Sequence, residues 1–163
     1  MSPLLDALGV DVAEVAAVLA VLRERGQTVA TAESLTAGAV VATLTEVPGS
    51  SAVVRGGLVV YATELKSRLA GVDAALLAEH GAVHPDVAAA LAVGARARCV
   101  ADLGLGLTGV AGPDGQDGVD PGTVYLALAG PDGITPRALR VPGDRHAVRA
   151  AAVRAAIDLL AGE

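Results

Sequence analysis

The sequence has few aromatic residues. Its 163 residues include no Phe or Trp and only two tyrosines, Tyr61 and Tyr125, while 53% of the residues are hydrophobic. A core must therefore be built mainly from Ala, Val and Leu, which requires close packing of the backbone. The length is sufficient for one domain with its own core, and no linker-like segment divides the chain, so we expect residues 1–163 to form a single domain.

Cysteine is almost absent as well. Cys99 is the only one, which excludes a disulfide within the chain. A chain that needs no disulfide fits the reducing cytoplasm, which is where we expect this protein. Cys99 lies near the end of an Ala-rich helical pattern, where packing is favoured over a role as nucleophile.

Clusters of basic residues are missing too. The formal net charge is −6, and no segment gathers Lys and Arg, which argues against nucleic-acid and anionic-membrane partners because both bind basic surfaces. The apolar N-terminal segment contains Asp6, Asp11 and Glu14, so it indicates neither a signal peptide nor a membrane span. We expect a small-molecule partner, and the sequence leaves homo-oligomer formation open.

Common cofactor and metal motifs are absent or misplaced. The P-loop pattern does not occur. The stretch GLGLTG, Gly104 to Gly109, has the GxGxxG spacing, but it lies within a predicted strand, where glycine more often marks close approach of another backbone. Gly81 interrupts the pair His80 and His84, and no cysteine or third histidine is near, so a turn and a helix entrance are favoured. We predict no cofactor and no metal site.

Hydrophobic periodicity predicts an α/β fold. Strands are expected at 27–33, 56–61, 103–110, 123–130 and 134–141, and helices at 10–25, 35–47, 62–72, 73–81, 85–101 and 145–160. The turn signal PDG at 131–133 predicts a hairpin between the last two strands, and Asp144 is the expected cap of the last helix. Strands separated by helices early and a hairpin late predict a three-layer α/β/α sandwich with a mixed, mostly parallel five-stranded sheet.

The stretch TAESLTAG places Ser34 between a predicted strand and a predicted helix. Serine commonly caps helices, so local evidence favours capping over nucleophilic attack. The GxSxG elbow is absent and no Ser–His–Asp order is recognisable, but a lysine can also serve as the base. Lys66 is the only lysine and follows Tyr61 by five residues, so both could face the Ser34 turn.

Two Gly- and Ser/Thr-rich turns, 48–51 and 108–115, are candidate anion sites.

Five ordered blocks resemble one known family. They are TAESLTAG, VPGSSAVVRGGLVVYATELKSRLAGV, AVHPDVAAALAVGAR, LTGVAGPDG with PGTVYLALA, and GDRHAVRAAAVRAAIDLL. In order and spacing, from Gln27 to Leu160, they resemble the C-terminal domain of the CinA (competence/damage-inducible) family. The chain is similar to the form of this domain that occurs alone as a nicotinamide-nucleotide amidase.

The resemblance implies deamidation of nicotinamide mononucleotide to nicotinate mononucleotide and ammonia, a step of pyridine nucleotide salvage, on a three-layer fold. It implies Ser34 as nucleophile and Lys66 as base, with Tyr61 nearby to relay a proton or to orient the lysine. To act as a base near pH 7.5, Lys66 must lose about 3 units of pKa through burial. The residues expected to bind the substrate are Thr36, Gly38, Ser50, Ser51, Thr108, Gly109, Gly112 and Arg145.

The sequence departs from the family pattern AESCTGG at two positions. Leu35 and Ala37 stand where the family usually has Cys and Gly. Neither change removes a reacting group, but the methyl group of Ala37 is expected to affect substrate preference. Two alternatives remain open at this point: a non-catalytic nucleotide-binding or regulatory module that keeps the family pocket, and a general hydrolase of small amides or esters.

Overall fold

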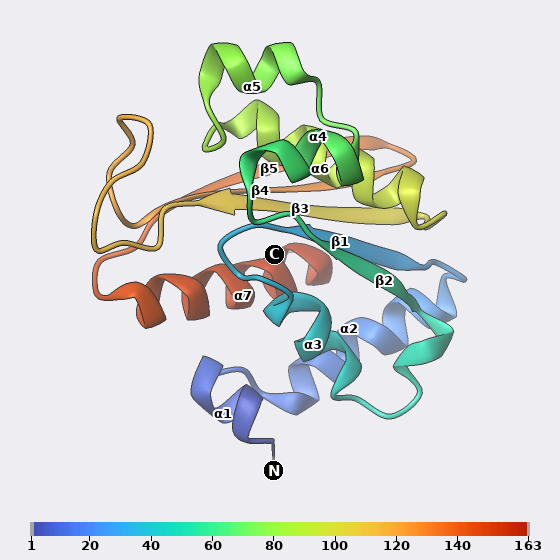
Figure 1. The fold of residues 1–163 in the computed structure, drawn as a ribbon. Helices are drawn as coiled ribbons and strands as arrows, with labels where there is room; N and C mark the ends of the chain where they lie inside the picture. Colours follow the sequence, from blue (N-terminus) through green and yellow to red (C-terminus); the bar gives the residue numbers. More distant parts are fainter. Residues whose placement is uncertain (1, 163) are drawn as a thin grey trace.

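Helices cover both faces of a five-stranded sheet in the computed structural model, which describes residues 2–162 (Figure 1). The strands are β1 (Val29–Glu33), β2 (Val54–Val59), β3 (Leu103–Gly109), β4 (Thr123–Gly130) and β5 (Gly133–Arg140). The helices are α1 (Pro3–Leu8), α2 (Val12–Glu24), α3 (Ala39–Thr45), α4 (Thr63–Ala70), α5 (Ala74–His80), α6 (Pro85–Arg98) and α7 (Arg145–Ala161), with a 3₁₀ turn at Ser50–Ala52. Within residues 2–162, no helix combines the length and the apolar character that crossing a bilayer requires.

The strand order is β2-β1-β3-β4-β5. Strand β1 runs parallel to both of its neighbours, β2 and β3, whereas β4 is antiparallel to β3 and to β5. Four strands therefore point one way and β4 points the other way, which confirms the predicted mixed sheet and three layers. The carboxyl ends of β1, β2 and β3 lie at the same edge, the usual place for a site in such sheets.

Each face of the sheet has its own apolar core. Helices α1, α2, α3 and α7 cover one face, and α4, α5 and α6 cover the other (Figure 1). Side chains of β1 alternate between the two cores, since Val29 packs in the first and Ala30 and Ala32 pack in the second. This alternation is expected for a strand that is covered on both faces.

The glycines of β3 allow α6 to lie close to the sheet. A Cβ atom at Gly104 would overlap the carbonyl oxygen of Ala92, and one at Gly106 would overlap that of Ala88. Both glycines lie within the strand. The preference for close backbone packing over a dinucleotide fingerprint is therefore confirmed, and such packing compensates for the lack of large aromatic side chains.

The predicted helices differ from the observed ones mainly at the N-terminus and after β1. The sequence predicted one first helix at 10–25, but a six-residue helix, α1, precedes α2 and is too short to produce a clear periodicity. The helix expected at 35–47 begins only at Ala39, because Ala37 and Gly38 adopt left-handed conformations, with φ of +50° and +94°. Asp144 caps α7 as predicted, accepting a hydrogen bond from the Ala147 N–H at 2.9 Å.

Candidate active site

Ser34 follows β1 directly at the carboxyl edge of the sheet. Its N–H donates to the Leu107 carbonyl of β3 at 3.1 Å, and the residue is only 8% exposed. Helix α3 has Gly38, not Ser34, at its N-cap position. The interpretation of Ser34 as a helix cap is therefore wrong, and its hydroxyl group is available for another role.

Glu33 takes over the capping of α3. Its side chain is fully buried. It accepts hydrogen bonds of 2.7–3.1 Å from the hydroxyl groups of Thr31 and Thr36 and from the N–H groups of Gly38, Val40 and Val41. A carboxylate at a helix N-terminus is stabilised by the unpaired N–H groups and by the helix dipole. Glu33 therefore fixes the turn that carries Ser34. The sequence analysis missed this role, although an acidic residue between a strand and a helix start is a usable signal.

Lys66 of α4 reaches Ser34 from the other face of the sheet. Its Nζ lies 3.0 Å from Ser34 Oγ, 2.8 Å from the Val60 carbonyl oxygen and 3.3 Å from the Tyr61 carbonyl oxygen. The residue is 1% exposed. The structure thus brings together the only lysine and the serine of the first strand-to-helix turn.

Burial makes the neutral form of Lys66 accessible. Desolvation lowers its pKa from 10.5 to about 8, although the nearby charge of Glu64 partly opposes this by raising it. Among residues 2–162, no carboxylate lies within 4 Å of the amine, where it would stabilise the protonated form. A neutral amine has two N–H donors and one lone pair. The protonated amine donates to all three oxygen atoms. Once one proton is lost, donation to the two carbonyl groups leaves the lone pair for the Ser34 hydroxyl.

Tyr61 contacts Lys66 through its backbone and not through its phenol. The residue is 58% exposed. Its hydroxyl accepts a hydrogen bond from Arg145 Nη2 at 3.1 Å, while Arg145 Nη1 donates to the Gly112 carbonyl at 2.9 Å. The structure therefore gives the Tyr61 side chain a place beside Arg145, and the Tyr61 carbonyl orients the lysine.

A cavity of about 230 Å³ opens in front of Ser34. Six of the residues that the sequence analysis selected line it: Ser34, Tyr61, Thr108, Gly109, Gly112 and Arg145. The Thr108 hydroxyl is buried and donates to the Ala82 carbonyl at 2.7 Å, so it holds the opposite wall instead of facing an open site. Lys66 is not among the lining residues and lies behind Ser34.

Four residues expected to bind substrate do not line this cavity. The Thr36 hydroxyl is bonded to Glu33, and Gly38 is the N-cap residue of α3. Ser50 and Ser51 form the 3₁₀ turn before β2. The exposed methyl group of Ala37 also lies outside the cavity lining, whereas buried Leu35 is part of it.

Two further segments contribute to the cavity, and only the second overlaps a predicted site, the turn at 108–115. Ala82 and Val83 come from the connection between α5 and α6, and Asp114 and Gln116 come from the loop between β3 and β4. These segments are distant from Ser34 in sequence and meet it only through the strand order. The turn-rich composition of residues 111–122 was a weak signal for the second segment.

The turn after Ser34 keeps two backbone donors available. The Ala37 N–H donates to the Ser34 carbonyl, and the Gly38 N–H donates to Glu33. The N–H groups of Leu35 and Thr36 have no acceptor among the described residues. Of these two residues only Leu35 lines the cavity, so its N–H is the candidate donor to a developing oxyanion.

Sequence comparisons match most of the chain to one family. The family model of the CinA C-terminal domain matches residues 12–163. A CinA-like protein of Frankia casuarinae is 51% identical over 143 residues, which cover 88% of this chain and 33% of that protein. A CinA-like protein of Geobacter sulfurreducens is 50% identical over 145 residues, covering 88% of this chain and 35% of its own length. The chain thus spans about a third of the length of these curated relatives.

Solved structures show the same fold. The competence/damage inducible protein CihA of Agrobacterium tumefaciens superposes with a TM-score of 0.88 at 34% identity, covering 93% of both chains. The competence damage-inducible protein A (ComA) of Klebsiella pneumoniae gives a TM-score of 0.89 at 32% identity, covering 93% of this chain and 95% of its own.

Proposed function

The chain belongs to the CinA C-terminal domain family, and from this membership and the contact between Ser34 and Lys66 we propose that it is a serine amidohydrolase. Its proposed substrate is nicotinamide mononucleotide, and its products are nicotinate mononucleotide and ammonia. The observation that carries the proposal is the 3.0 Å contact between the Lys66 amine and the Ser34 hydroxyl. A buried amine beside a serine is a known way to activate this weak nucleophile.

The reaction proceeds in two halves. Ser34 Oγ attacks the carboxamide carbon while its proton passes to the neutral amine of Lys66. The C–N bond of the tetrahedral intermediate then breaks, and the Lys66 ammonium returns the proton to the departing ammonia. A water molecule, deprotonated by the same amine, hydrolyses the acyl-enzyme and regenerates Ser34 with nicotinate mononucleotide. The N–H group of Leu35, which lines the cavity, is the proposed donor to the oxyanion.

The charges at the cavity suit both ends of this substrate. Arg145 uses two of its five N–H groups on Gly112 and Tyr61, so three remain for a phosphate. The Asp114 carboxylate also lines the cavity and complements the positive charge of the pyridinium ring. A cavity of about 230 Å³ accommodates the ring and ribose, with the phosphate at the exposed Arg145.

An ammonia-release assay tests the proposal. We expect the wild-type chain to release ammonia from nicotinamide mononucleotide and Ser34→Ala to lose at least about 10³-fold in kcat, because the nucleophile is removed. Ser51→Ala is a matched control, since Ser51 is exposed and lies outside the cavity. This control should retain wild-type turnover.

Substrate analogues separate the alternatives. Nicotinamide riboside lacks the phosphate, so the proposal expects a much lower kcat/KM than for the mononucleotide. Equal rates on simple amides would identify a general amide hydrolase instead. Binding of the mononucleotide without ammonia release by the wild-type chain would identify a non-catalytic nucleotide-binding module.

A further inference from the structure

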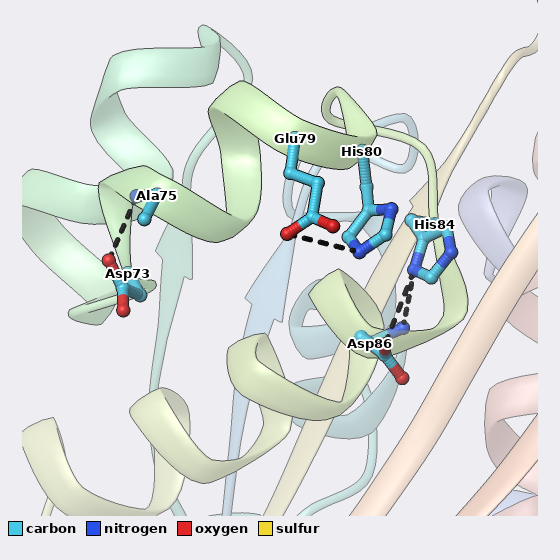
Figure 2. Close-up of polar contacts among 6 residues, drawn as sticks. All are labelled: Asp73, Ala75, Glu79, His80, His84 and Asp86. Atoms are coloured by element: carbon cyan, nitrogen blue, oxygen red, sulfur yellow. Dashed lines mark hydrogen bonds and ion pairs between the residues drawn. The ribbon is translucent and has the colours of Figure 1, made fainter.

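Three metal-ligating side chains meet outside the cavity, where α5 leads into α6. His80 ends α5, His84 precedes α6, and Asp86 lies in its first turn (Figure 2). One ring nitrogen from each histidine and one carboxylate oxygen of Asp86 all lie within 4.8 Å of one another. We propose that these three side chains bind one divalent transition-metal ion, with Zn²⁺ as the best match. No metal was predicted here because Gly81 interrupts the pair and no cysteine or third histidine is near, but the structure brings the carboxylate of Asp86 to the two rings.

The chemistry of the donors selects the class of ion. Two imidazole nitrogens and one carboxylate oxygen are typical ligands of Zn²⁺, whereas Mg²⁺ and Ca²⁺ prefer oxygen ligands alone. Three protein ligands leave one tetrahedral position open. Glu79 offers a further donor, with Oε2 3.9 Å from His80 Nε2 (Figure 2). A water molecule or this carboxylate completes the coordination.

The side chains must move slightly to coordinate the ion. Ligand atoms in a tetrahedral zinc site are about 3.4 Å apart, which follows from bond lengths of about 2.1 Å. The two rings are stacked, with centroids 4.1 Å apart and planes inclined by 13°. Coordination turns the rings out of this stack, because their lone pairs lie in the ring planes. The side chains of His80 and His84 are 31% and 32% exposed and that of Asp86 is 66% exposed, so they have room to move.

One existing hydrogen bond must be replaced. His84 Nδ1 accepts the Asp86 N–H at 3.2 Å and so caps α6, which confirms the predicted helix entrance. This N–H is near the surface, so it can donate to a water molecule instead when His84 Nδ1 binds the ion.

The ion would restrain one wall of the cavity. Residues 81–83 connect the two histidines, and Ala82 and Val83 line the cavity in front of Ser34. An ion held by both histidines ties the two ends of this short segment together. Metal binding itself does not depend on the proposed amidase activity, so the two proposals can fail separately.

Direct metal titration tests the site. The full chain, freed of any affinity tag and stripped with a chelator, is titrated with Co²⁺ by visible absorption and with Zn²⁺ by competition against a chromophoric chelator. We expect one ion per chain and at least about tenfold weaker binding in His80→Gln and Asp86→Asn, because each removes a ligand. His84→Ser should weaken binding equally while an oxygen still caps α6.

Two control variants separate this cluster from other donors. His146 bonds to the Ala7 carbonyl and is the only other histidine, and Cys99 is the only thiol. His146→Gln and Cys99→Ser should bind as the wild type does. Zn²⁺ should also raise the thermal midpoint of the wild type but not that of the double variant His80→Gln/His84→Ser. Absence of binding to the wild type, unchanged binding in that double variant, or an ion shared between two chains would overturn the proposal.

Discussion

Two buried ionisable side chains flank Ser34 from opposite faces of the sheet, and their surroundings differ. Glu33 faces α3 and accepts five hydrogen bonds, three of them from backbone N–H groups. Lys66 of α4 meets three oxygen atoms and no carboxylate among the described residues, and burial lowers its pKa to about 8. Fixed dipoles around Glu33 hold a turn in place, whereas burial of Lys66 lowers its pKa toward neutral pH. Glu33 therefore has a structural role, and Lys66 has the properties that the proposed chemical role requires.

The largest expected effect follows from Lys66→Met, which keeps the shape of the side chain but removes the amine. We expect kcat for ammonia release to fall at least about 10³-fold, because the proposed base is lost. The free energy of unfolding should change by no more than about 1 kcal/mol at pH 7. Relief of a desolvation penalty of about 3 kcal/mol is offset by the loss of the three hydrogen bonds of the amine, about 1 kcal/mol each. Urea unfolding measures this change.

The two readouts of Lys66→Met distinguish the chemical role from a structural one. A loss of activity together with a large loss of stability would mean that Lys66 serves mainly to hold the fold. Full activity in a well-folded Lys66→Met chain would contradict the proposed base.

Glu33→Gln is expected to lower stability much more than Lys66→Met does. A neutral amide offers one acceptor oxygen to three backbone N–H groups, so at least one stays unpaired in the interior. We expect the free energy of unfolding to fall by about 2–4 kcal/mol. Activity should fall as well, since the Ser34 turn loosens. Urea unfolding of Glu33→Gln beside Glu24→Gln, whose side chain is exposed, checks this, and equal stability of both variants would contradict the structural role of Glu33.

The pH dependence of turnover tests the lowered pKa of Lys66 and does not involve Glu33. Only the neutral amine accepts the Ser34 proton, so kcat/KM should rise about tenfold per pH unit at low pH and level off above the Lys66 pKa of about 8.

The lowered pKa of Lys66 also affects the stability of the fold. Between about 8 and 10.5 the unfolded chain binds the proton and the folded chain does not, so stability rises with pH in that window. Lys66→Met should lack this rise, and an identical stability profile in both chains would contradict the lowered pKa.

Much of the fold could be predicted because its elements are marked locally. The strands of the sheet appear as short apolar runs bounded by Gly, Pro or Asp, and the turn at 131–133 sets the hairpin of β4 and β5. The short α1 was missed because six residues carry little periodicity. The start of α3 was placed too early, because Glu33 supplies the cap from outside the helix and the intervening residues form a turn.

The candidate site was predictable only in part, because some of its residues are marked locally in the sequence and others meet only through the fold. Ser34 and Lys66 could be paired from the sequence because each follows a strand that ends at the same edge of the sheet. The contribution of Val83 was not predicted, since its loop reaches Ser34 only through the strand order, whereas Asp114 lies in the turn 108–115 that was selected as a candidate anion site. Ser50 was selected for its Gly- and Ser-rich turn, but that turn lies outside the cavity lining.

The smallest expected effect is that of Ala37→Gly, which tests whether the turn held by Glu33 has only a structural role. Ala37 has a φ of +50° and an exposed side chain outside the cavity lining. A left-handed conformation costs an L-residue other than glycine about 1 kcal/mol, so glycine should raise the free energy of unfolding by about that amount. Activity should stay within about twofold, because Ala37 is exposed and does not line the cavity. A change in substrate preference in Ala37→Gly, measured on the mononucleotide and the riboside, would mean that this turn reaches the substrate after all.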